Sequence, residues 1–458
     1  MDNIVTNKEK ISYGLYFMGQ NIFYGLVGYM TIYFTDIGIA ASMVVIVALI
    51  TKLWDAINDP IFGMLMDKIK FKNGKFLPWL RISVFVIPIS TVLLFMIPSD
   101  IPQMAKVIWA TIAYMLWDTA YTLCDVPIFG IVTTMTTDQN ERRIINTIGR
   151  MFVILSGIVT GIVLPLIRQS LGGWSTTVIV LSVVSVITMI PICLYAKERV
   201  IEKENEMDKG EKENYTLKDM IVCLKTNKYL LIFFASPLIS SLLNVGASWG
   251  LYIARYCLGG EQVASYTAII MIVPTIIGAL ISIKLCKKYD KFKVFYASYI
   301  FAVIVGIVRF IAGYENLTMY MILNAVGGLP LGVALVLQYQ FTPDCYEYGQ
   351  YKTGLKMRGV TFAAQTFFTK LNGAIATAVS MFALSLIGFR EGEGVRQAVG
   401  FADKLWTFSC LGSIVGGIST LIILYFYKLN DHDVQLMAKC NNGEISREEV
   451  QNQMINDY

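Results

Sequence analysis

Long apolar stretches separated by short polar breaks dominate this 458-residue chain. A helix crosses about 30 Å of hydrocarbon with about 20 apolar residues, because each residue advances it by about 1.5 Å. Twelve stretches reach that length, so the pattern predicts twelve transmembrane helices. They cover approximately residues 11–35, 42–66, 79–97, 104–128, 146–168, 175–196, 229–256, 264–286, 293–313, 318–341, 360–388 and 401–428.

A densely charged segment rich in Lys and Glu separates the sixth stretch from the seventh. The chain is therefore predicted to be an all-α membrane protein with two six-helix bundles. The predicted parts are an N-terminal bundle over 1–196, a cytoplasmic linker over 197–228, a C-terminal bundle over 229–428 and a cytoplasmic tail over 429–458. In the tail, Ser446 and Glu449 have the spacing of a capping box, which predicts a short helix.

The distribution of Lys and Arg predicts the orientation of the chain. The breaks after the second, fourth, sixth, eighth and tenth stretches are basic, whereas the break at 36–41 has no basic residue. Basic loops stay on the cytoplasmic side, so both termini are predicted to be cytoplasmic in a multi-pass protein of the cytoplasmic (inner) membrane. No small-residue cleavage site follows Lys8 and Lys10, which favours a retained first helix over a signal peptide.

Composition supports a lipid environment and argues against several classes of enzyme. Apolar residues make up 55% and charged residues 16% of the chain, and the mean hydropathy is +0.57. A soluble domain carries about 25% charged residues. The single histidine, His432, and eight dispersed cysteines argue against His-based zinc sites, Ser-His-Asp triads and haem ligation. We expect no enzyme, no cofactor and no metal beyond a coupling cation.

The stretch over 42–66 contains three polar residues that share one face of a helix. Asp55, Asn58 and Asp59 are spaced by three and four residues. An ionisable residue near the bilayer centre costs about 2.5–3.5 kcal/mol on insertion scales, so such residues are few and functional by default. Two carboxylates one turn apart need a counter-charge. A proton would supply it, as would Na⁺ held by these oxygens and a hydroxyl such as Thr122, while fixed ion pairs, for instance with Lys370, are the structural alternative.

Two further stretches carry polar residues where lipid would exclude them. The stretch over 104–128 has a polar stripe, and the stretch over 360–388 has an internal lysine with polar neighbours. The stripe consists of Asp118, Tyr121, Thr122 and Asp125, and the second group includes Gln365, Thr366 and Lys370.

Three motifs resemble those of the glycoside–pentoside–hexuronide:cation symporters, the melibiose permease-like branch of the major facilitator superfamily. The first is WDAINDPI at 54–61, followed by GKFLPW at 74–79. The second is YTLCDVP at 121–127, and the third is DCYEYGQYKTG at 344–354. The resemblance covers roughly residues 10–430, and two bundles of six spans joined by a charged linker fit the same superfamily.

The resemblance implies a major facilitator fold and secondary active symport of a sugar, glycoside or hexuronide with Na⁺ or H⁺, and Li⁺ is also compatible. The implied cation ligands are Asp55, Asn58, Asp59 and Thr122, with Asp59 shared by Na⁺ and H⁺ coupling. The implied substrate contacts are Gln20, Asn21, Tyr121, Asp125, Phe129, Arg150, Gln365, Thr366 and Lys370. Asp36 and Lys52 resemble a pair of gating residues near the outer mouth.

The chain departs from the family pattern on the sugar side. Gln20 and Asn21 replace a Lys-Asp pair of the first helix, and Phe129 replaces a tryptophan. These changes remove a carboxylate that accepts sugar hydroxyl bonds and an indole that stacks on a pyranose, so a galactoside is disfavoured. Asn21 suits an uncharged sugar or a sugar acid. Asp118 lies outside the family pattern, either as an extra polar contact or as a satisfied helix–helix bond.

Three other functions compete with sugar symport. A cation-coupled lysolipid transporter of the same fold would retain the acids of the second span, but the polar residues predicted around the sugar favour a sugar. A membrane enzyme would need a nucleophile or metal cluster, for which the chain offers no convincing candidate. A sugar sensor would need a signalling domain, which the short tail lacks. The predicted partners are a small sugar, the cation and the bilayer, without nucleic acid.

Overall fold

The structure, a computed structural model, describes residues 5–69, 71, 74–136, 138–168, 170–199, 224–354, 358–392 and 394–456. The chain divides into two compact units. Unit 1 contains Met1–Gly210 and Gly388–Ala398, and unit 2 contains Glu211–Ile387 and Val399–Tyr458. Each unit is helical in its described part.

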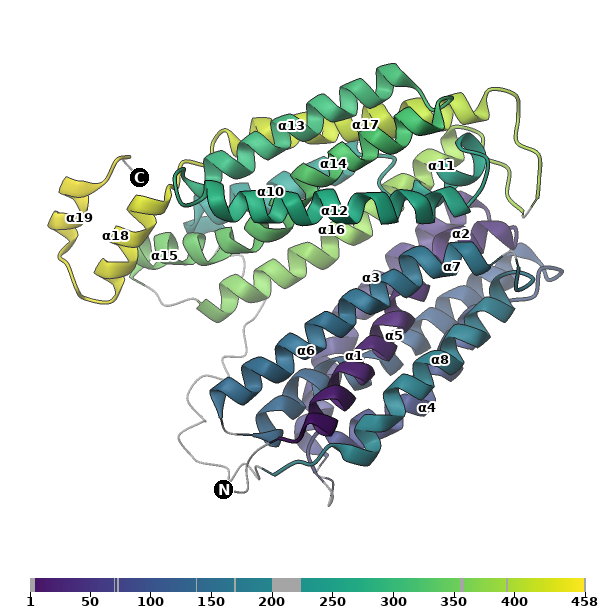
Figure 1. Cartoon of the computed structure of the whole chain (residues 1–458), viewed down its shortest axis with the longest axis horizontal. Coiled ribbons are helices and arrows are strands. Elements are labelled where there is room, and N and C mark those ends of the chain that lie inside the picture. Colours follow the sequence, from purple (N-terminus) through teal and green to yellow (C-terminus); the bar gives the residue numbers. More distant parts are fainter. Residues whose placement is uncertain are drawn as a thin grey trace. The chain divides into compact units, whose positions relative to one another are not determined.

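Unit 1 contains the elements of the first six predicted spans (Figure 1). Its helices are α1 (Asn7–Val27), α2 (Met30–Asp36), α3 (Ala41–Lys68), α4 (Leu77–Leu94), α5 (Gln103–Met135), α6 (Gln139–Ile158), the π-helical turn η1 (Val159–Val163), α7 (Leu164–Ile167) and α8 (Trp174–Tyr195).

Unit 2 contains the elements of the last six predicted spans and the tail. Its helices are α10 (Lys228–Leu243), α11 (Gly250–Cys257), α12 (Gln262–Leu285), α13 (Lys291–Ala312), α14 (Leu317–Leu337), the 3₁₀ turn η3 (Gln338–Gln340), α15 (Phe341–Thr353), α16 (Arg358–Leu386), α17 (Phe401–Leu424), α18 (Asp431–Asn441) and α19 (Arg447–Gln453).

The helices of both units pack in the same order. In unit 1, the neighbours run α3, α5, α4, α8, α1, α6, and in unit 2 they run α12, α14, α13, α17, α10, α16. Numbered as predicted spans, the first order is 2, 4, 3, 6, 1, 5 and the second is 8, 10, 9, 12, 7, 11. Each position differs by six, so the two halves are structural repeats of the kind that transporter folds contain.

The chain is a multi-pass membrane protein. Within the described residues, eight helical segments are long and apolar enough to cross a membrane. They are Leu77–Leu94, Ile144–Ile167, Trp174–Tyr195, Gln262–Leu285, Lys291–Ala312, Leu317–Thr353, Val360–Leu386 and Phe401–Leu424, which coincide with eight predicted spans. The other four predicted spans correspond to α1 with α2, to α3, to α5, and to α10 with α11.

Two of these spans are interrupted at equivalent positions of the repeats. The first predicted span breaks between α1 and α2, and the seventh breaks between α10 and α11. The pattern of apolar residues predicted continuous helices here. The chain packs closely at the second break. A Cβ on Gly246 would collide with the backbone of Ser409 in α17. Interrupted helices in corresponding places of two repeats indicate where a transporter binds its substrate.

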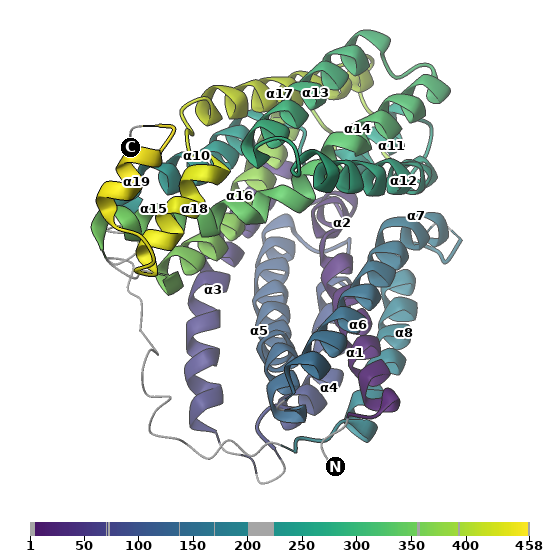
Figure 2. The same ribbon diagram turned by 60° about the vertical axis from the view of Figure 1, so that its left-hand side comes forward.

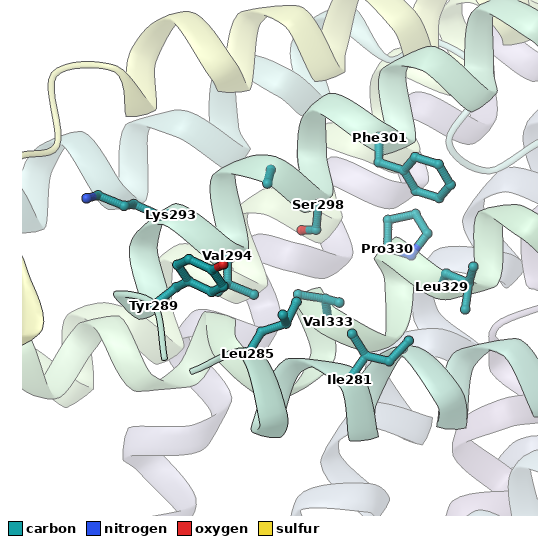
Figure 3. A pocket seen from close by; sticks show the side chains of 12 residues that line it. Ile281, Leu285, Tyr289, Lys293, Val294, Ser298, Phe301, Leu329, Pro330 and Val333 are labelled. Atoms are coloured by element: carbon teal, nitrogen blue, oxygen red, sulfur yellow. The ribbon is translucent and has the colours of Figure 1, made fainter. Parts of the chain in front are cut away.

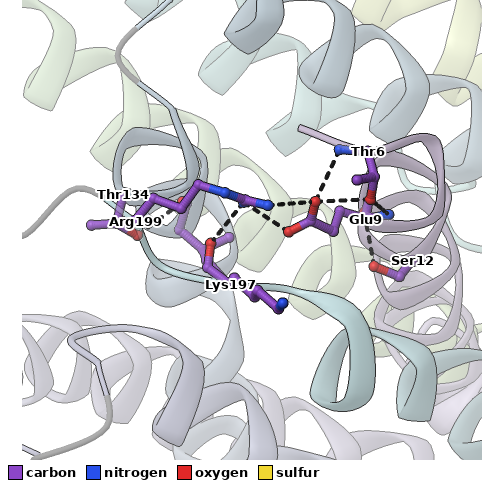
Figure 4. A network of polar contacts seen from close by, with 7 residues as sticks. Thr6, Glu9, Ser12, Thr134, Lys197 and Arg199 are labelled. Carbon is purple, nitrogen blue, oxygen red and sulfur yellow. Dashed lines mark hydrogen bonds and ion pairs between the residues drawn. The ribbon is translucent and has the colours of Figure 1, made fainter. Parts of the chain in front are cut away.

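A polar network joins the beginning of α1 to the residues that follow α8 (Figure 4). The guanidinium of Arg199 donates to both carboxylate oxygens of Glu9 at 2.8 and 2.9 Å, and Arg199 N–H donates to the Thr134 carbonyl at 2.8 Å. Thr6 and Glu9 also form a capping box. Burial acts to raise the pKa of Glu9, but the hydrogen bonds from Arg199 and Thr6 outweigh it, and the pKa lies below its ordinary value.

Glu198 anchors the adjacent residue of the chain on another helix. Its carboxylate accepts hydrogen bonds from the backbone N–H groups of Lys75, Phe76 and Leu77, at 2.9, 2.9 and 2.6 Å. These N–H groups lie at the start of α4 and just before it, where the helix offers them no intrahelical acceptor. The chain leaving α8 is therefore held against unit 1 at two successive residues.

The tail forms two helices that pack beside α15 (Figure 2). The predicted capping box is confirmed, since Ser446 and Glu449 bond reciprocally at the start of α19. Asn441 donates to the Glu347 carboxylate at 2.8 Å, and Arg447 donates to the Tyr351 carbonyl at 2.9 Å. Both contacts tie the tail to the third sequence motif.

The loop between α16 and α17 groups with unit 1, although the predicted boundaries assign it to the second bundle. Gly392 N–H donates to the Thr35 carbonyl at 2.9 Å. The Glu391 carboxylate accepts from the backbone N–H of Ala41, the first residue of α3, at 3.1 Å. These two contacts join the loop to α2 and to the start of α3.

Candidate functional site

A buried polar layer lies between α3 and α5 of unit 1. The Nδ2 of Asn58 donates to Oδ2 of Asp118 at 3.2 Å and to Oγ1 of Thr122 at 2.8 Å. The Thr122 hydroxyl in turn donates to the backbone carbonyl of Asp118 at 3.0 Å. All three residues are buried. The helical spacing predicted from the sequence thus brings one amide of α3 onto two polar residues of α5.

The carbonyl oxygen of Asn58 is held less tightly than its amide nitrogen. The Thr119 hydroxyl lies 3.3 Å from Asn58 Oδ1, and it also donates to the Met115 carbonyl at 2.8 Å. Trp54, the first residue of the first motif, donates its indole N–H to Thr119 at 3.2 Å. A hydroxyl has one proton, so it cannot donate fully to both acceptors. Asn58 Oδ1 therefore retains the capacity to coordinate a cation.

Asp55 lies in the same part of α3 and is buried. Its carboxylate is 3.6 Å from the ammonium group of Lys52, three residues earlier. This places a positive charge beside one of the two predicted acids. Asp59 lies within α3, but its side chain is outside what the structure describes. Its assignment as a cation ligand remains a prediction.

Asp118 takes part in this layer, although it lies outside the family pattern. Sequence reasoning left two readings open, an extra polar contact or a satisfied helix–helix bond. The bond to Asn58 is between helices and links residues 60 positions apart. The sequence signal was its position, three and four residues before Tyr121 and Thr122 on one stripe of α5.

The two predicted sugar contacts on α1 have different surroundings. Gln20 is buried and donates from Nε2 to Oδ1 of Asp125 at 2.9 Å, while its Oε1 has no hydrogen-bond partner among the described residues. Asn21 donates to the Phe17 carbonyl of its own helix at 2.8 Å. A buried amide oxygen without a donor is costly, and a ligand hydroxyl would satisfy it.

Aromatic side chains of α1 and α5 contact one another in unit 1. Tyr121 stacks on Trp117 with ring centres 5.1 Å apart, and it lies 5.6 Å from Tyr24 of α1. Phe129 contacts Phe17 edge to face at 5.4 Å. Half of the side chain of Phe129 is exposed, so it presents an apolar surface without the indole N–H of a tryptophan.

The Arg150 guanidinium carbon lies 6.0 Å from the centre of the Phe129 ring. Three helices of unit 1, α1, α5 and α6, thus contact one another through side chains of this region. They carry the predicted substrate contacts Gln20, Tyr121, Asp125, Phe129 and Arg150.

The two predicted gating residues have separate partners in the structure. Asp36 accepts a hydrogen bond from the indole N–H of Trp174 at 2.8 Å and lies 3.9 Å from Arg168. The Arg168 guanidinium also lies over the Trp174 ring, 4.7 Å from its centre. Lys52 lies beside Asp55 instead. Arg168 was not predicted as a partner of Asp36. The gating role of Asp36 and Lys52 stays a prediction.

Three predicted substrate contacts lie on α16 of unit 2. Gln365 and Lys370 are half-buried, and Thr366 is exposed and donates to the Phe362 carbonyl at 3.3 Å. On the neighbouring α10, Ser241 donates to the Asn372 side chain at 2.6 Å. α16 thus carries a polar stretch within a membrane helix, and its predicted contact with sugar is untested.

The third motif forms α15 and the start of the loop that follows it. Its Asp344 binds Lys291 at 2.6 Å, and Gly354 ends the helix with a left-handed φ of +73°. Glycine adopts this conformation without steric cost. The ion pair of Asp344 and the helix end at Gly354 are structural features, so the described residues of this motif contribute to the packing of unit 2.

Within the described residues, no group of three or more His, Cys, Asp or Glu side chains could hold a metal ion. The predicted ligands of the coupling cation differ from such a cluster, because they combine carboxylates with an amide and a hydroxyl. Hard oxygen ligands of this mixed kind suit alkali cations better than transition metals.

Known proteins similar to this chain are transport proteins. A family model described as MFS/sugar transport protein matches residues 12–431. The chain is 28% identical over 437 residues to the uncharacterized symporter YjmB of Bacillus subtilis (strain 168), with 93% of each chain covered. It is 24% identical to the putative glycoside/cation symporter YagG of Escherichia coli (strain K12), with 95% of each covered.

The isoprimeverose transporter of Lactiplantibacillus pentosus is 25% identical to this chain, over 95% of this chain and 91% of that protein. A crystal structure of the nucleoside transporter NupG matches with a TM-score of 0.61 and 13% identity, and it covers 91% of this chain and 99% of that one. At this identity the structural likeness concerns the fold alone.

Proposed function

This chain belongs to the MFS/sugar transport protein family, and we propose that it carries a sugar, glycoside or hexuronide across the membrane together with Na⁺ or H⁺. The observation that carries the cation part is the buried contact of Asn58 with Asp118 and Thr122, one turn from Asp55. A relative named as a glycoside/cation symporter and another named as an isoprimeverose transporter support the cargo.

The proposed cation site consists of Asp55, Asn58, Asp59 and Thr122. Asp55 and Asp59 are one helical turn apart in the sequence of α3, and a bound cation would neutralise negative charge that is costly within a membrane. Asp118 holds the Asn58 amide, so that the Asn58 carbonyl oxygen is the atom offered to the cation. Asp118 is thus a positioning residue in this proposal.

The proposed sugar site combines hydroxyl partners with an apolar surface. Gln20 donates a hydrogen bond to Asp125, and its own Oε1 is able to accept one from a sugar hydroxyl. Phe129 offers a ring face to the apolar side of a sugar, and Arg150 lies beside it. Asn21, Tyr121, Gln365, Thr366 and Lys370 complete the predicted contacts. This polarity favours a sugar over a lysolipid.

Coupling follows from binding both ligands in one conformation. The cation neutralises the acids of α3 and favours the geometry that accepts sugar, and the empty or doubly loaded carrier then changes between outward and inward states. Thermodynamic linkage makes the effect reciprocal, so sugar tightens cation binding by the factor with which cation tightens sugar binding. Equal sugar affinity with and without cation, at fixed ionic strength, would contradict this mechanism.

Uptake into proteoliposomes tests the proposal. Glycosides, pentosides, hexuronates and a lysophospholipid are compared, each with and without a Na⁺ or pH gradient. We expect one sugar class to accumulate only with a gradient. Asp59→Asn should abolish accumulation and retain some exchange, whereas Asp100→Asn, in an exposed loop, should leave both unchanged. Full accumulation by the Asp59 variant would remove this cation site.

We also propose that both termini lie on the cytoplasmic side of the inner membrane. The basic breaks that follow the even-numbered spans support this orientation. Trypsin added to inside-out vesicles should cleave the lysine-rich segment 197–228, and trypsin added to right-side-out vesicles should not. The reverse result would invert the topology.

A further inference from the structure

Unit 2 contains an apolar cavity between three neighbouring membrane helices (Figure 3). Its volume is about 420 Å³, within the range of about 300–1,000 Å³ that small-molecule sites occupy. The residues lining it come from α12, α13, α14 and the turn between α12 and α13. The apolar ones used below are Ile281, Leu285, Ala297, Phe301 and Val333.

The cavity is open at the surface of unit 2. Ile281, Leu285 and Phe301 expose 41%, 37% and 39% of their surface, although all three are large and apolar. The floor is rigid, because α12 and α14 pack backbone against backbone: a Cβ on Gly278 would collide with the Leu329 carbonyl. The missing side chain of Gly278 therefore allows α12 and α14 to approach each other closely below the cavity.

Two residues with polar groups, Lys293 and Tyr289, lie at one end of the cavity. Figure 3 shows Lys293 and Tyr289 at one end and Phe301 and Leu329 at the other. Ser298, in between, donates its hydroxyl proton to the Phe295 carbonyl at 2.7 Å. The surface of the cavity itself is apolar, and Lys293 and Tyr289 lie at one of its ends.

The charges around this end leave Lys293 available for an anion. The turn between α12 and α13 and its flanks carry five lysines, at 284, 287, 288, 291 and 293. The nearby acids are Asp290, Asp344 and Asp431. Lys291 pairs with Asp344 at 2.6 Å and with Asp431 at 3.0 Å. Asp290 accepts the backbone N–H groups of Phe292 at 2.9 Å and Asp431 at 2.7 Å. Lys293 is exposed at the cavity.

We propose that this cavity binds an anionic phospholipid of the cytoplasmic leaflet, with an acyl chain between α12, α13 and α14 and the phosphate group held by Lys293 and Tyr289. Basic pockets between membrane helices on the cytoplasmic side bind anionic head groups. The basic turn lies on that side in the orientation proposed above, which rests on the positive-inside bias. An apolar cavity with a lysine and a tyrosine at one end matches a lipid, because an apolar chain and an anionic group lie at opposite ends of a phospholipid.

The test uses the full chain reconstituted in bilayers with a phosphatidylglycerol probe that carries a photoactivatable group on one acyl chain. Crosslinked peptides are located by mass spectrometry. We expect crosslinks on the segments of α12, α13 and α14 that line the cavity, with competition by unlabelled phosphatidylglycerol and little by phosphatidylcholine. Equal competition by both lipids, or crosslinks spread evenly over the lipid-facing helices, would overturn the proposal without any variant.

Two pairs of matched variants test the two ends separately. Lys293→Gln should weaken probe binding several-fold, because it removes the basic group at the cavity that binds the anionic head group. Lys287→Gln removes the same charge outside the lining of the cavity and should weaken binding clearly less. Ala297→Trp fills the cavity and should abolish the crosslinks, while Ala302→Trp lies exposed on the same helix outside it. Equal behaviour within either pair would overturn the proposal, whatever sugar the protein transports.

Discussion

The side-chain nitrogen of Asn58 in α3 lies 3.2 Å from a carboxylate oxygen of Asp118 in α5. This bond connects two helices that both carry residues of the proposed cation site. Because Asp118 accepts from the Asn58 amide nitrogen, the amide oxygen is turned toward other partners. A residue outside the family motifs thereby orients one inside them.

Replacing Asp118 tests this relationship. Asp118→Ala leaves the buried Asn58 amide without one acceptor, and we expect cation affinity to fall about 10- to 100-fold, as for residues that orient metal ligands. Titration of cation-driven uptake measures the change. Asp118→Asn, which retains an acceptor oxygen, should recover much of the affinity. An unchanged cation affinity in Asp118→Ala would show that the contact serves packing alone.

Gln20 and Asp125 give a second prediction, on the sugar side. Gln20→Glu places a second carboxylate within about 3 Å of Asp125, and like charges at this separation repel each other. We expect sugar uptake to fall at least ten-fold at neutral pH and to recover partly as the pH is lowered. Gln103→Glu, at the exposed beginning of α5, is the control. Equal loss in both variants would make the effect one of net charge.

The buried pair of Asp36 and Arg168 predicts a stability effect. Arg168→Leu removes the guanidinium from a buried carboxylate, which costs about 3 kcal/mol when one partner of a buried pair is lost. Denaturation in detergent measures the free energy of unfolding. The double variant Asp36→Asn with Arg168→Leu should be more stable than Arg168→Leu alone. A double variant that is less stable would argue against a direct interaction.

The Glu9–Arg199 network predicts a dependence on pH. The pKa of Glu9 in the folded protein lies below the ordinary value of 4.5, so ionised Glu9 stabilises the fold at pH values above 4.5. This stabilisation is lost as the pH falls through the lowered pKa. Unfolding measured at several pH values around and below 4.5 should show a steeper loss for the wild-type chain than for Glu9→Gln. The exposed Glu315→Gln should keep the wild-type slope.

Much of the fold followed from local sequence patterns. Eight predicted spans coincide with helices long and apolar enough to cross a membrane, because span length and hydropathy are properties of consecutive residues. The capping box at Ser446 and Glu449 formed as predicted for the same reason. The breaks between α1 and α2 and between α10 and α11 were not predicted, since close helix packing, as of Gly246 against Ser409, leaves little trace in an apolar run.

The sequence by itself determined a multi-pass α-helical protein, its two sets of six spans and the few internal acids that oppose insertion into lipid. Tertiary structure alone decided that Asp118 pairs with Asn58, that Arg168 lies beside Asp36, and that a cavity with one cationic end forms between α12, α13 and α14. The physical reason is that spans arise from neighbouring residues and their transfer into lipid, whereas these contacts join side chains from different helices and depend on how the helices pack.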